Sequence, residues 1–276
     1  MKKNLSRFAI AALAWAVAFP ANAQVFEGKR GLEDFKIGIA GYTYRKFPLE
    51  ETLKMIQQAG VKYMSVKDFH LPFHSTAEEM EAFKKKCAEY GVDPYILGPI
   101  NNMNSEKNVD DAFAYAQRYG AKMFIGVPSY EMLPYLEKRV KETGIKVAIH
   151  THGPDKAPFP DAKEIVDRVK DPKKGIGICL DLGHTVRYGG NAAADLIKYK
   201  EWIYDIHFKD EEGANKESKT IEMGRGVMDY RPILKALEAI GYQGVVSLEF
   251  EKDPDNPQPG VLESIGYFRG MADGMN

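Results

Sequence analysis

The stretch Gly175–His184 reads Gly-Ile-Gly-Ile-Cys-Leu-Asp-Leu-Gly-His. Small or apolar residues fill both alternating faces of this run until it ends at Asp181 and His184. A strand that is buried on both faces is typical of a parallel sheet. Parallel α/β folds place their chemistry at the carboxyl ends of the strands. We therefore interpret this stretch as a central strand that carries ligand-type side chains at its functional end.

The same pattern, a short apolar run followed by a polar turn and a helical period, occurs eight times along the chain. The expected strands are Ile37–Ala40, Tyr63–Val66, Tyr95–Leu97, Met123–Val127, Lys146–Ile149, the opening stretch, Ile203–Phe208 and Val245–Phe250. The expected helices are Leu49–Ala59, one capped by Ser75 or Thr76 that runs through Tyr90, Val109–Tyr119, Met132–Thr143, Ala162–Val169, Ala192–Tyr199, Tyr230–Ile240 and Pro259–Met271. The charged run Glu211–Lys219 is expected to be a solvated loop or a lid.

Eight strand–helix pairs without a long linker predict an α/β fold with one (β/α)8 TIM barrel in residues 24–276. A doubly wound open sheet is the alternative. The sequence after the first strand has no Gly-x-Gly-x-x-Gly motif, which disfavours a dinucleotide-binding sheet.

Residues 1–23 have the pattern of a secretory signal peptide. They start with basic residues, continue with the apolar run Phe8–Phe19 and end with the small-residue sequence Ala21-Asn22-Ala23. We expect a mature chain that begins near Gln24, is periplasmic or secreted, and has no membrane contact after cleavage. A retained N-terminal anchor is the alternative.

Charge and cysteine content narrow the class of partner. The formal charge is −1 and becomes more negative when the basic leader is removed, which argues against a nucleic acid partner. Cys87 lies in a helical pattern and Cys179 in a strand, so we expect two buried free thiols, with a disulfide as the alternative. The oligomeric state stays open, a homo-oligomer included.

Four consecutive strands end with a polar side chain on the same relative face. These terminal residues are His150, Asp181, His207 and Glu249. Their face carries small or polar residues, while the opposite face is bulky and apolar and should pack against the outer helices. Two imidazoles and two carboxylates suit one divalent metal ion, with Zn, Mn, Fe, Co and Ni all compatible. A satisfied polar core residue is the alternative for each of them.

Five segments resemble motifs of the xylose isomerase-like TIM-barrel family of sugar-phosphate isomerases and epimerases, which is also related to endonuclease IV. The segments are Asp181-Leu182-Gly183-His184, His207-Phe208-Lys209-Asp210, Gly224-Arg225-Gly226, Asp229-Tyr230 and Ser247-Leu248-Glu249. The resemblance covers most of the mature chain. It implies that Asp181, His207 and Glu249 bind metal. It also implies that His184 and Lys209 hold substrate oxygens.

The fifth strand departs from that resemblance. Family members usually end it with Glu-Asn-His, where the Glu binds metal and moves a proton, whereas this chain reads His150-Thr151-His152. The ligand role can pass to His150, but the carboxylate base is missing. Epimerisation with two bases loses one partner, whereas β-elimination needs one base only.

We therefore expect a metal-dependent keto-sugar lyase. Glu249 would remove the proton α to the ketone of a 3-keto-glycoside, and the C1 substituent would leave, as in a 3-keto-glucoside 1,2-lyase. His152 or His184 would protonate the leaving group. If His150 acts as a base, an isomerase or epimerase that works through an enediolate is the alternative. A non-catalytic sugar-binding barrel is the alternative outside the enzymes.

Residues after other strands are candidates for contacts with the carbohydrate substrate. Tyr42 follows the first strand and could stack on a sugar ring, with rim packing as the alternative. Among the polar residues after the second strand we favour His70 as a pocket residue. Arg225 lies between two glycines, where backbone can approach a ligand closely, and is a further candidate.

Overall fold

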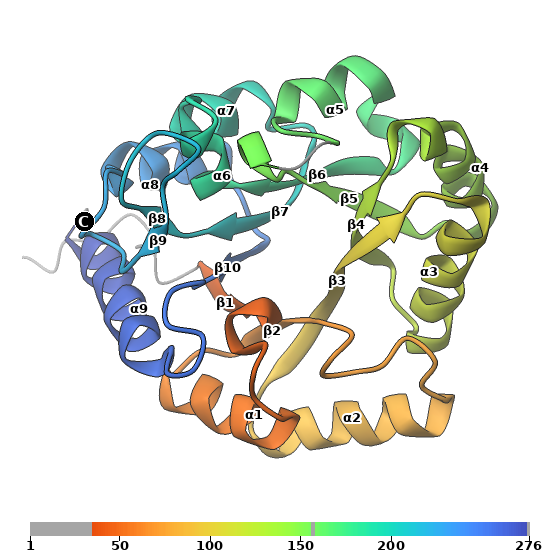
Figure 1. Cartoon of the computed structure of the whole chain (residues 1–276), viewed down its shortest axis with the longest axis horizontal. Helices are drawn as coiled ribbons and strands as arrows, with labels where there is room; N and C mark the ends of the chain where they lie inside the picture. Colours follow the sequence, from red (N-terminus) through yellow and green to blue (C-terminus); the bar gives the residue numbers. More distant parts are fainter. Residues whose placement is uncertain (1–34, 156–157, 275–276) are drawn as a thin grey trace, which may run out of the picture.

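The protein forms a closed barrel of eight parallel strands with helices around the outside (Figure 1). The computed structural model describes residues 35–155 and 158–274. The barrel strands are β1 Lys36–Ala40, β2 Tyr63–Val66, β3 Asp93–Met103, β4 Met123–Pro128, β5 Lys146–His150, β6 Ile176–Asp181, β7 Ile203–Phe208 and β10 Val245–Leu248. Their order around the barrel is β1-β10-β7-β6-β5-β4-β3-β2. The predicted (β/α)8 barrel is confirmed.

Most helices lie where the hydrophobic pattern places them. The helices are α1 Leu49–Gln58, α2 Ala77–Glu89, α3 Glu106–Tyr119, α4 Leu133–Thr143, α5 Ala162–Val169, α6 Leu182–Arg187, α7 Ala192–Lys198, α8 Tyr230–Ala239 and α9 Gln258–Asp273. Short 3-10 helices are η2 Gly41–Tyr44, η3 Tyr130–Met132, η4 Gly153–Asp155 and η5 Pro172–Lys174. The short helix α6 was not predicted, because it begins immediately where β6 ends.

Local chemistry sets the helix ends. The Thr76 hydroxyl accepts the Glu79 N–H at 3.2 Å, and the Glu79 carboxylate accepts the Thr76 N–H at 2.7 Å. This reciprocal capping box selects Thr76 over Ser75 as the first cap of α2. At the other end of a helix, Gly120 closes α3 with φ 79°, a left-handed conformation that glycine adopts without steric cost.

The barrel interior is separate from the apolar layer between strands and helices. Its buried apolar residues are Ile96, Ile125, Ala148 and Cys179. Beside them Tyr95 donates its hydroxyl to Asp205 at 3.0 Å and lies 2.9 Å from the hydroxyl of Ser247. Small and polar residues therefore face inward on the strands from β5 to β10, which confirms the predicted strand parity.

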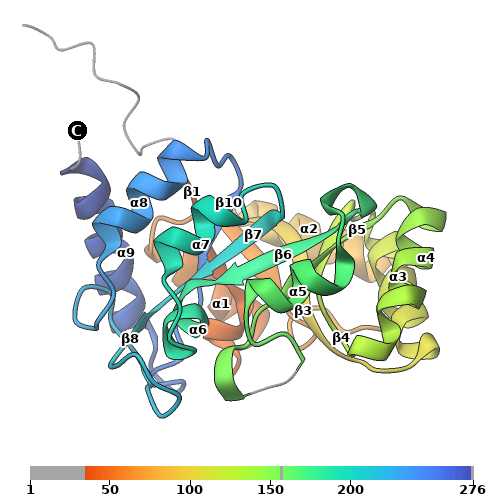
Figure 2. The same ribbon diagram turned by 90° about the horizontal axis from the view of Figure 1, so that it is seen from above.

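The segment after β7 differs from the prediction. It contains a two-stranded antiparallel sheet, β8 Asp210–Glu211 and β9 Thr220–Ile221. Glu211 is buried and accepts the Ser218 hydroxyl at 3.0 Å, so the predicted fully solvated charged run is wrong at this residue. Figure 2 shows α6 and β8 at the same end of the barrel.

The predicted leader, residues 1–23, lies outside the described residues. Within the described residues, no helix is long and apolar enough to cross a membrane. Cys87 and Cys179 are buried free thiols, as predicted.

Candidate metal centre and active site

Four buried side chains converge where β5, β6, β7 and β10 end. His150, Asp181, His207 and Glu249 each offer one ligand atom, and these atoms all lie within 4.8 Å of one another. His150 Nε2 is 3.1 Å from His207 Nδ1 and 3.7 Å from Asp181 Oδ2. Glu249 Oε1 is 3.7 Å from His207 Nδ1. The structure therefore brings these four residues together, as predicted.

The donor set fits a divalent metal ion. With metal–ligand bonds of about 2.0–2.2 Å, neighbouring donors of a tetrahedral ion lie roughly 3.4 Å apart, close to the separations seen here. Burial and the nearby His152 hold the pKa of His150 well below its ordinary value, so this imidazole is neutral and offers a lone pair. Asp181 Oδ2 is buried and has no hydrogen-bond partner among the described residues, although the Lys209 ammonium lies 3.1 Å away.

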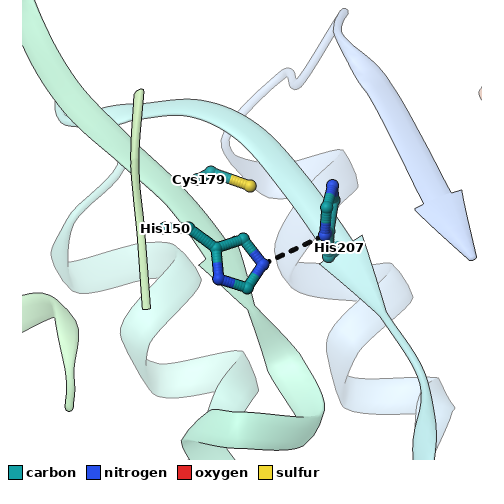
Figure 3. Close-up of side chains that lie close together, drawn as sticks. All are labelled: His150, Cys179 and His207. Atoms are coloured by element: carbon teal, nitrogen blue, oxygen red, sulfur yellow. Dashed lines mark hydrogen bonds between the residues drawn. The ribbon is translucent and has the colours of Figure 1, made fainter. Parts of the chain in front are cut away.

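A cysteine lies next to the two imidazoles of the centre. Figure 3 shows the side chains of His150, Cys179 and His207 together, and this set also has ligand atoms within 4.8 Å of one another. The Cys179 thiol is 3.6 Å from Asp205 Oδ2, and burial raises its pKa well above the ordinary value. Because the thiol set shares both imidazoles with the carboxylate set, it is part of the same centre.

The Asp181-Leu182-Gly183-His184 motif is explained by the junction of β6 and α6. Asp181 Oδ1 accepts the His184 N–H at 2.8 Å and caps α6, which leaves Oδ2 to face the centre. A Cβ on Gly183 would lie 2.5 Å from Cγ of Lys209, so glycine makes room for the lysine stem. The same turn brings His184 Nε2 to 3.2 Å from Lys209 Nζ.

The ammonium of Lys209 is buried among carboxylates. Lys209 is 0% exposed, and its Nζ lies 2.9 Å from Glu249 Oε2 and 2.5 Å from Glu251 Oε1. Burial would lower the pKa of Lys209, but Asp181 and Glu249 raise it well above its ordinary value. Burial would likewise raise the pKa of Glu249, but Lys209 and His207 hold it well below its ordinary value. Lysine and glutamate are therefore both charged.

Asp181 and Asp205 respond differently, because burial outweighs their favourable contacts. Burial raises the pKa of Asp181 to about 7, against the opposing charge of Lys209. Burial also raises the pKa of Asp205 to about 6, against the opposing effect of His207. Asp205 Oδ2 lies 3.7 Å from His207 Nε2, on the side of the ring away from His150. This places a carboxylate behind a candidate metal-binding imidazole, the arrangement that commonly orients such rings.

A cavity of about 220 Å³ opens onto the centre. Its lining residues are Tyr42, Lys67, Pro99, Asn101, His150, His152, His184, Arg187, Glu249 and Glu251. Three of the residues that we predicted to contact or protonate the substrate, Tyr42, His152 and His184, line this cavity. Lys209 lies directly beneath this lining through its contacts with His184, Glu249 and Glu251.

Of the predicted substrate contacts, Lys209, His70 and Arg225 are not among the residues that line the cavity. His70 is buried beside α1, where its Nε2 lies 3.2 Å from the Thr52 hydroxyl and 3.3 Å from the Phe47 carbonyl. Burial lowers the pKa of His70 to about 4, as expected for a neutral core histidine. The structure therefore gives His70 a packing role and places Lys67, from the same segment, in the cavity wall.

Arg225 points away from the cavity because of the loop that carries it. Asp210 Oδ2 accepts the N–H groups of Gly224 at 2.8 Å and of Gly226 at 3.2 Å. A Cβ on Gly226 would lie 2.2 Å from Asp210 Oδ1, so the close approach requires glycine. Arg225 is exposed and pairs with Glu263 at 2.5 Å, outside the cavity lining.

Glu251 and Arg187 line the cavity but were not singled out from the sequence. Glu251 follows Glu249 by two residues and therefore shares its strand parity, a signal that could have found it. Arg187 had no such signal, because it lies on the unpredicted helix α6.

The protein is thus a closed parallel (β/α)8 barrel. It has a buried cluster of two histidines and two carboxylates where its strands end. The xylose isomerase-like TIM barrel family model matches residues 53–271, and the chain belongs to this family. It is 32% identical over 222 residues to the inosose dehydratase of Geobacillus thermodenitrificans, with 72% of this chain and 71% of the relative covered. The chain spans about half the length of other curated relatives, such as 47% of the inosose dehydratase of Lacticaseibacillus casei at 28% identity, with 46% of this chain covered.

Solved structures share the fold at low sequence identity. The 3-keto-D-glucoside 4-epimerase YcjR from E. coli is 16% identical with a TM-score of 0.68, and covers 86% of this chain and 99% of its own. The IolI protein, described with a binding zinc atom, is 20% identical with a TM-score of 0.66, and covers 87% of this chain and 99% of its own.

Proposed function

We propose that this protein is a metal-dependent carbon–oxygen lyase that acts on a keto-sugar. It would remove the proton α to the ketone of a 3-keto-glycoside and expel the C1 substituent. The family and the donor set support a divalent metal and a sugar-type substrate. A relative named for a dehydration agrees with an elimination, whereas the structural neighbour named as a 3-keto-D-glucoside 4-epimerase is named for the alternative reaction.

The distribution of carboxylates around the cavity carries the proposal. The two carboxylates in the cavity lining, Glu249 and Glu251, follow the same strand and contact the same ammonium of Lys209. Strand β5 instead ends with the imidazole of His150, and His152 follows two residues later. An elimination needs one base for the α-proton, whereas a two-base epimerisation needs a proton acceptor on each side of the substrate.

Each residue has a role in this reaction. The metal, when bound by His150, Asp181, His207 and Glu249, would act as a Lewis acid on the ketone. Glu249, held ionised, accepts the C2 proton, and the electron pair of the broken C–H bond forms the double bond as the C1–O bond breaks. The Lys209 ammonium, buried beneath the cavity lining, holds Glu249 ionised and so supports its role as the base. His152 or His184 gives a proton to the departing oxygen.

The test is release of the aglycone from a 3-keto-glucoside by protein that has been stripped of metal and reloaded. We expect metal-dependent release of the free alcohol or phenol together with an unsaturated keto-sugar. Epimerisation of the same compound without release would support the isomerase or epimerase alternative. Binding without turnover and without stoichiometric metal would support a sugar-binding barrel.

Location is a separate proposal that rests on residues 1–23 alone. The basic, apolar and small-residue segments support export to the periplasm or secretion. Mass spectrometry of protein isolated from cell fractions tests this, with an N-terminus near Gln24 expected and an intact Met1 in the cytoplasm as the contrary result.

A further inference from the structure

The ammonium of Lys209 and a divalent metal ion would draw on the same carboxylates. Lys209 Nζ lies 3.1 Å from Asp181 Oδ2, the oxygen that also faces His150. It lies 2.9 Å from Glu249 Oε2, while the other oxygen of Glu249 faces His207. Two of the four candidate ligands therefore already contact a buried cation. A metal ion that binds them must do so beside a positive charge that water does not screen.

Glu251 is the partner of Lys209 that stands outside the ligand set. Its Oε1 lies 2.5 Å from Lys209 Nζ, closer than either candidate ligand. About a third of the Glu251 side chain is exposed to the cavity, whereas Lys209 is fully buried. Glu251 is thus an anionic contact of the ammonium outside the four-residue ligand set, although it also belongs with His184 and Glu249 to a second group of potential ligand atoms that lie within 4.8 Å of one another.

We propose that Glu251 is an anionic anchor that holds Lys209 beside the metal position and thereby sets the metal affinity of the centre. The proposal rests on the proposed metal-dependent function. A divalent ion and one ammonium carry three positive charges, which the carboxylates of Asp181, Glu249 and Glu251 balance when all three are ionised. Without Glu251, the ammonium would contact only the two ligand carboxylates. It would then compete with the metal ion for them and repel it.

The experiment measures metal affinity by competition with a chromophoric chelator, using zinc or cobalt as the probe and no substrate. Glu251→Gln should weaken metal binding by about 10- to 100-fold, the range typical of residues that support metal ligands. In a Lys209→Met background, Glu251→Gln should change the affinity by less than about threefold, because no ammonium remains to be anchored. Glu222→Gln is the matched control, since Glu222 pairs with Lys252 at 2.9 Å and does not line the cavity.

Two results would overturn the proposal. One is an unchanged affinity after Glu251→Gln with Lys209 present. The other is an equal loss in both backgrounds, which would mean that Glu251 acts on the metal directly. Lys209→Gln, whose amide still donates to carboxylates, serves as a second neutral background if Lys209→Met unfolds. Failure of wild-type protein to bind stoichiometric metal would instead contradict the proposed function itself.

Discussion

The ends of β5 and β10 face the same cavity with opposite chemistry. The end of β5 and the residues after it present the imidazoles of His150 and His152, whereas the residues after β10 present the carboxylates of Glu249 and Glu251. Burial favours the neutral form on both sides, but the neighbouring charges differ. It leaves His150 neutral with a pKa well below its ordinary value, while Lys209 and His207 keep Glu249 ionised.

The difference teaches which side of the cavity can take a proton. The lone pair of the neutral His150 imidazole is committed once a metal binds. An ionised carboxylate next to an ammonium keeps an acceptor oxygen. We therefore propose that proton removal falls to the β10 side, and changes on either side should test that asymmetry.

Removing the carboxylate on the β10 side should have the largest effect. Glu249→Gln should lower aglycone release per bound metal by about 10²–10⁴-fold, the usual contribution of a general base. Metal content measured alongside separates the two roles of this residue, because three other ligands remain to hold an ion at saturating metal. Turnover per bound metal equal to wild type would show that Glu249 is a ligand only.

Adding a carboxylate on the β5 side should break the asymmetry. His150→Glu places an acidic group opposite Glu249 and should raise epimerisation of a 3-keto-glucoside by about 10²-fold relative to elimination. The product ratio is read by NMR in deuterated water. His150→Gln is the matched control, since it removes the imidazole without adding a base. An unchanged product ratio in His150→Glu would mean that β5 does not decide the reaction.

The barrel and the four convergent residues could be predicted from the sequence because strand parity is strict. Every second residue of a strand shares a face, so the positions of His150, Asp181, His207 and Glu249 followed from counting. Strand counting gives no direction for His70 and Arg225, which lie on loops and outside the cavity lining. The Asp210 carboxylate turns the Gly224–Gly226 loop, a long-range contact that no local pattern reveals.

Asp205, which lies behind the His207 ring, should give a smaller effect, on the pH dependence of the unfolding free energy. Burial raises the pKa of Asp205 to about 6, above the ordinary 3.8, so between these values the folded protein holds a proton that the unfolded chain has lost. This contribution to stability is fully present below the ordinary pKa of Asp205. It is lost as the pH rises through the pKa that Asp205 has in the folded protein. In metal-free protein, the unfolding free energy should therefore fall by about 1 kcal/mol more between about pH 5 and pH 6 in wild type than in Asp205→Asn. The unfolding free energy is measured by urea unfolding at each pH. The same pH dependence in wild type and Asp205→Asn would contradict the assignment.

The smallest effect should come from Arg225, the residue that the loop turns away from both sides of the cavity. Its guanidinium forms an exposed pair with Glu263, and exposed pairs contribute about 0–1 kcal/mol to stability. Arg225→Ala should therefore leave KM and turnover within about twofold of wild type and change the unfolding free energy by less than about 1 kcal/mol. Lys67→Met provides the comparison, because Lys67 lines the cavity. Removing its charge should raise KM. A large rise in KM for Arg225→Ala, with Lys67→Met unaffected, would mean that the loop closes over the substrate and that the cavity extends beyond the wall seen here.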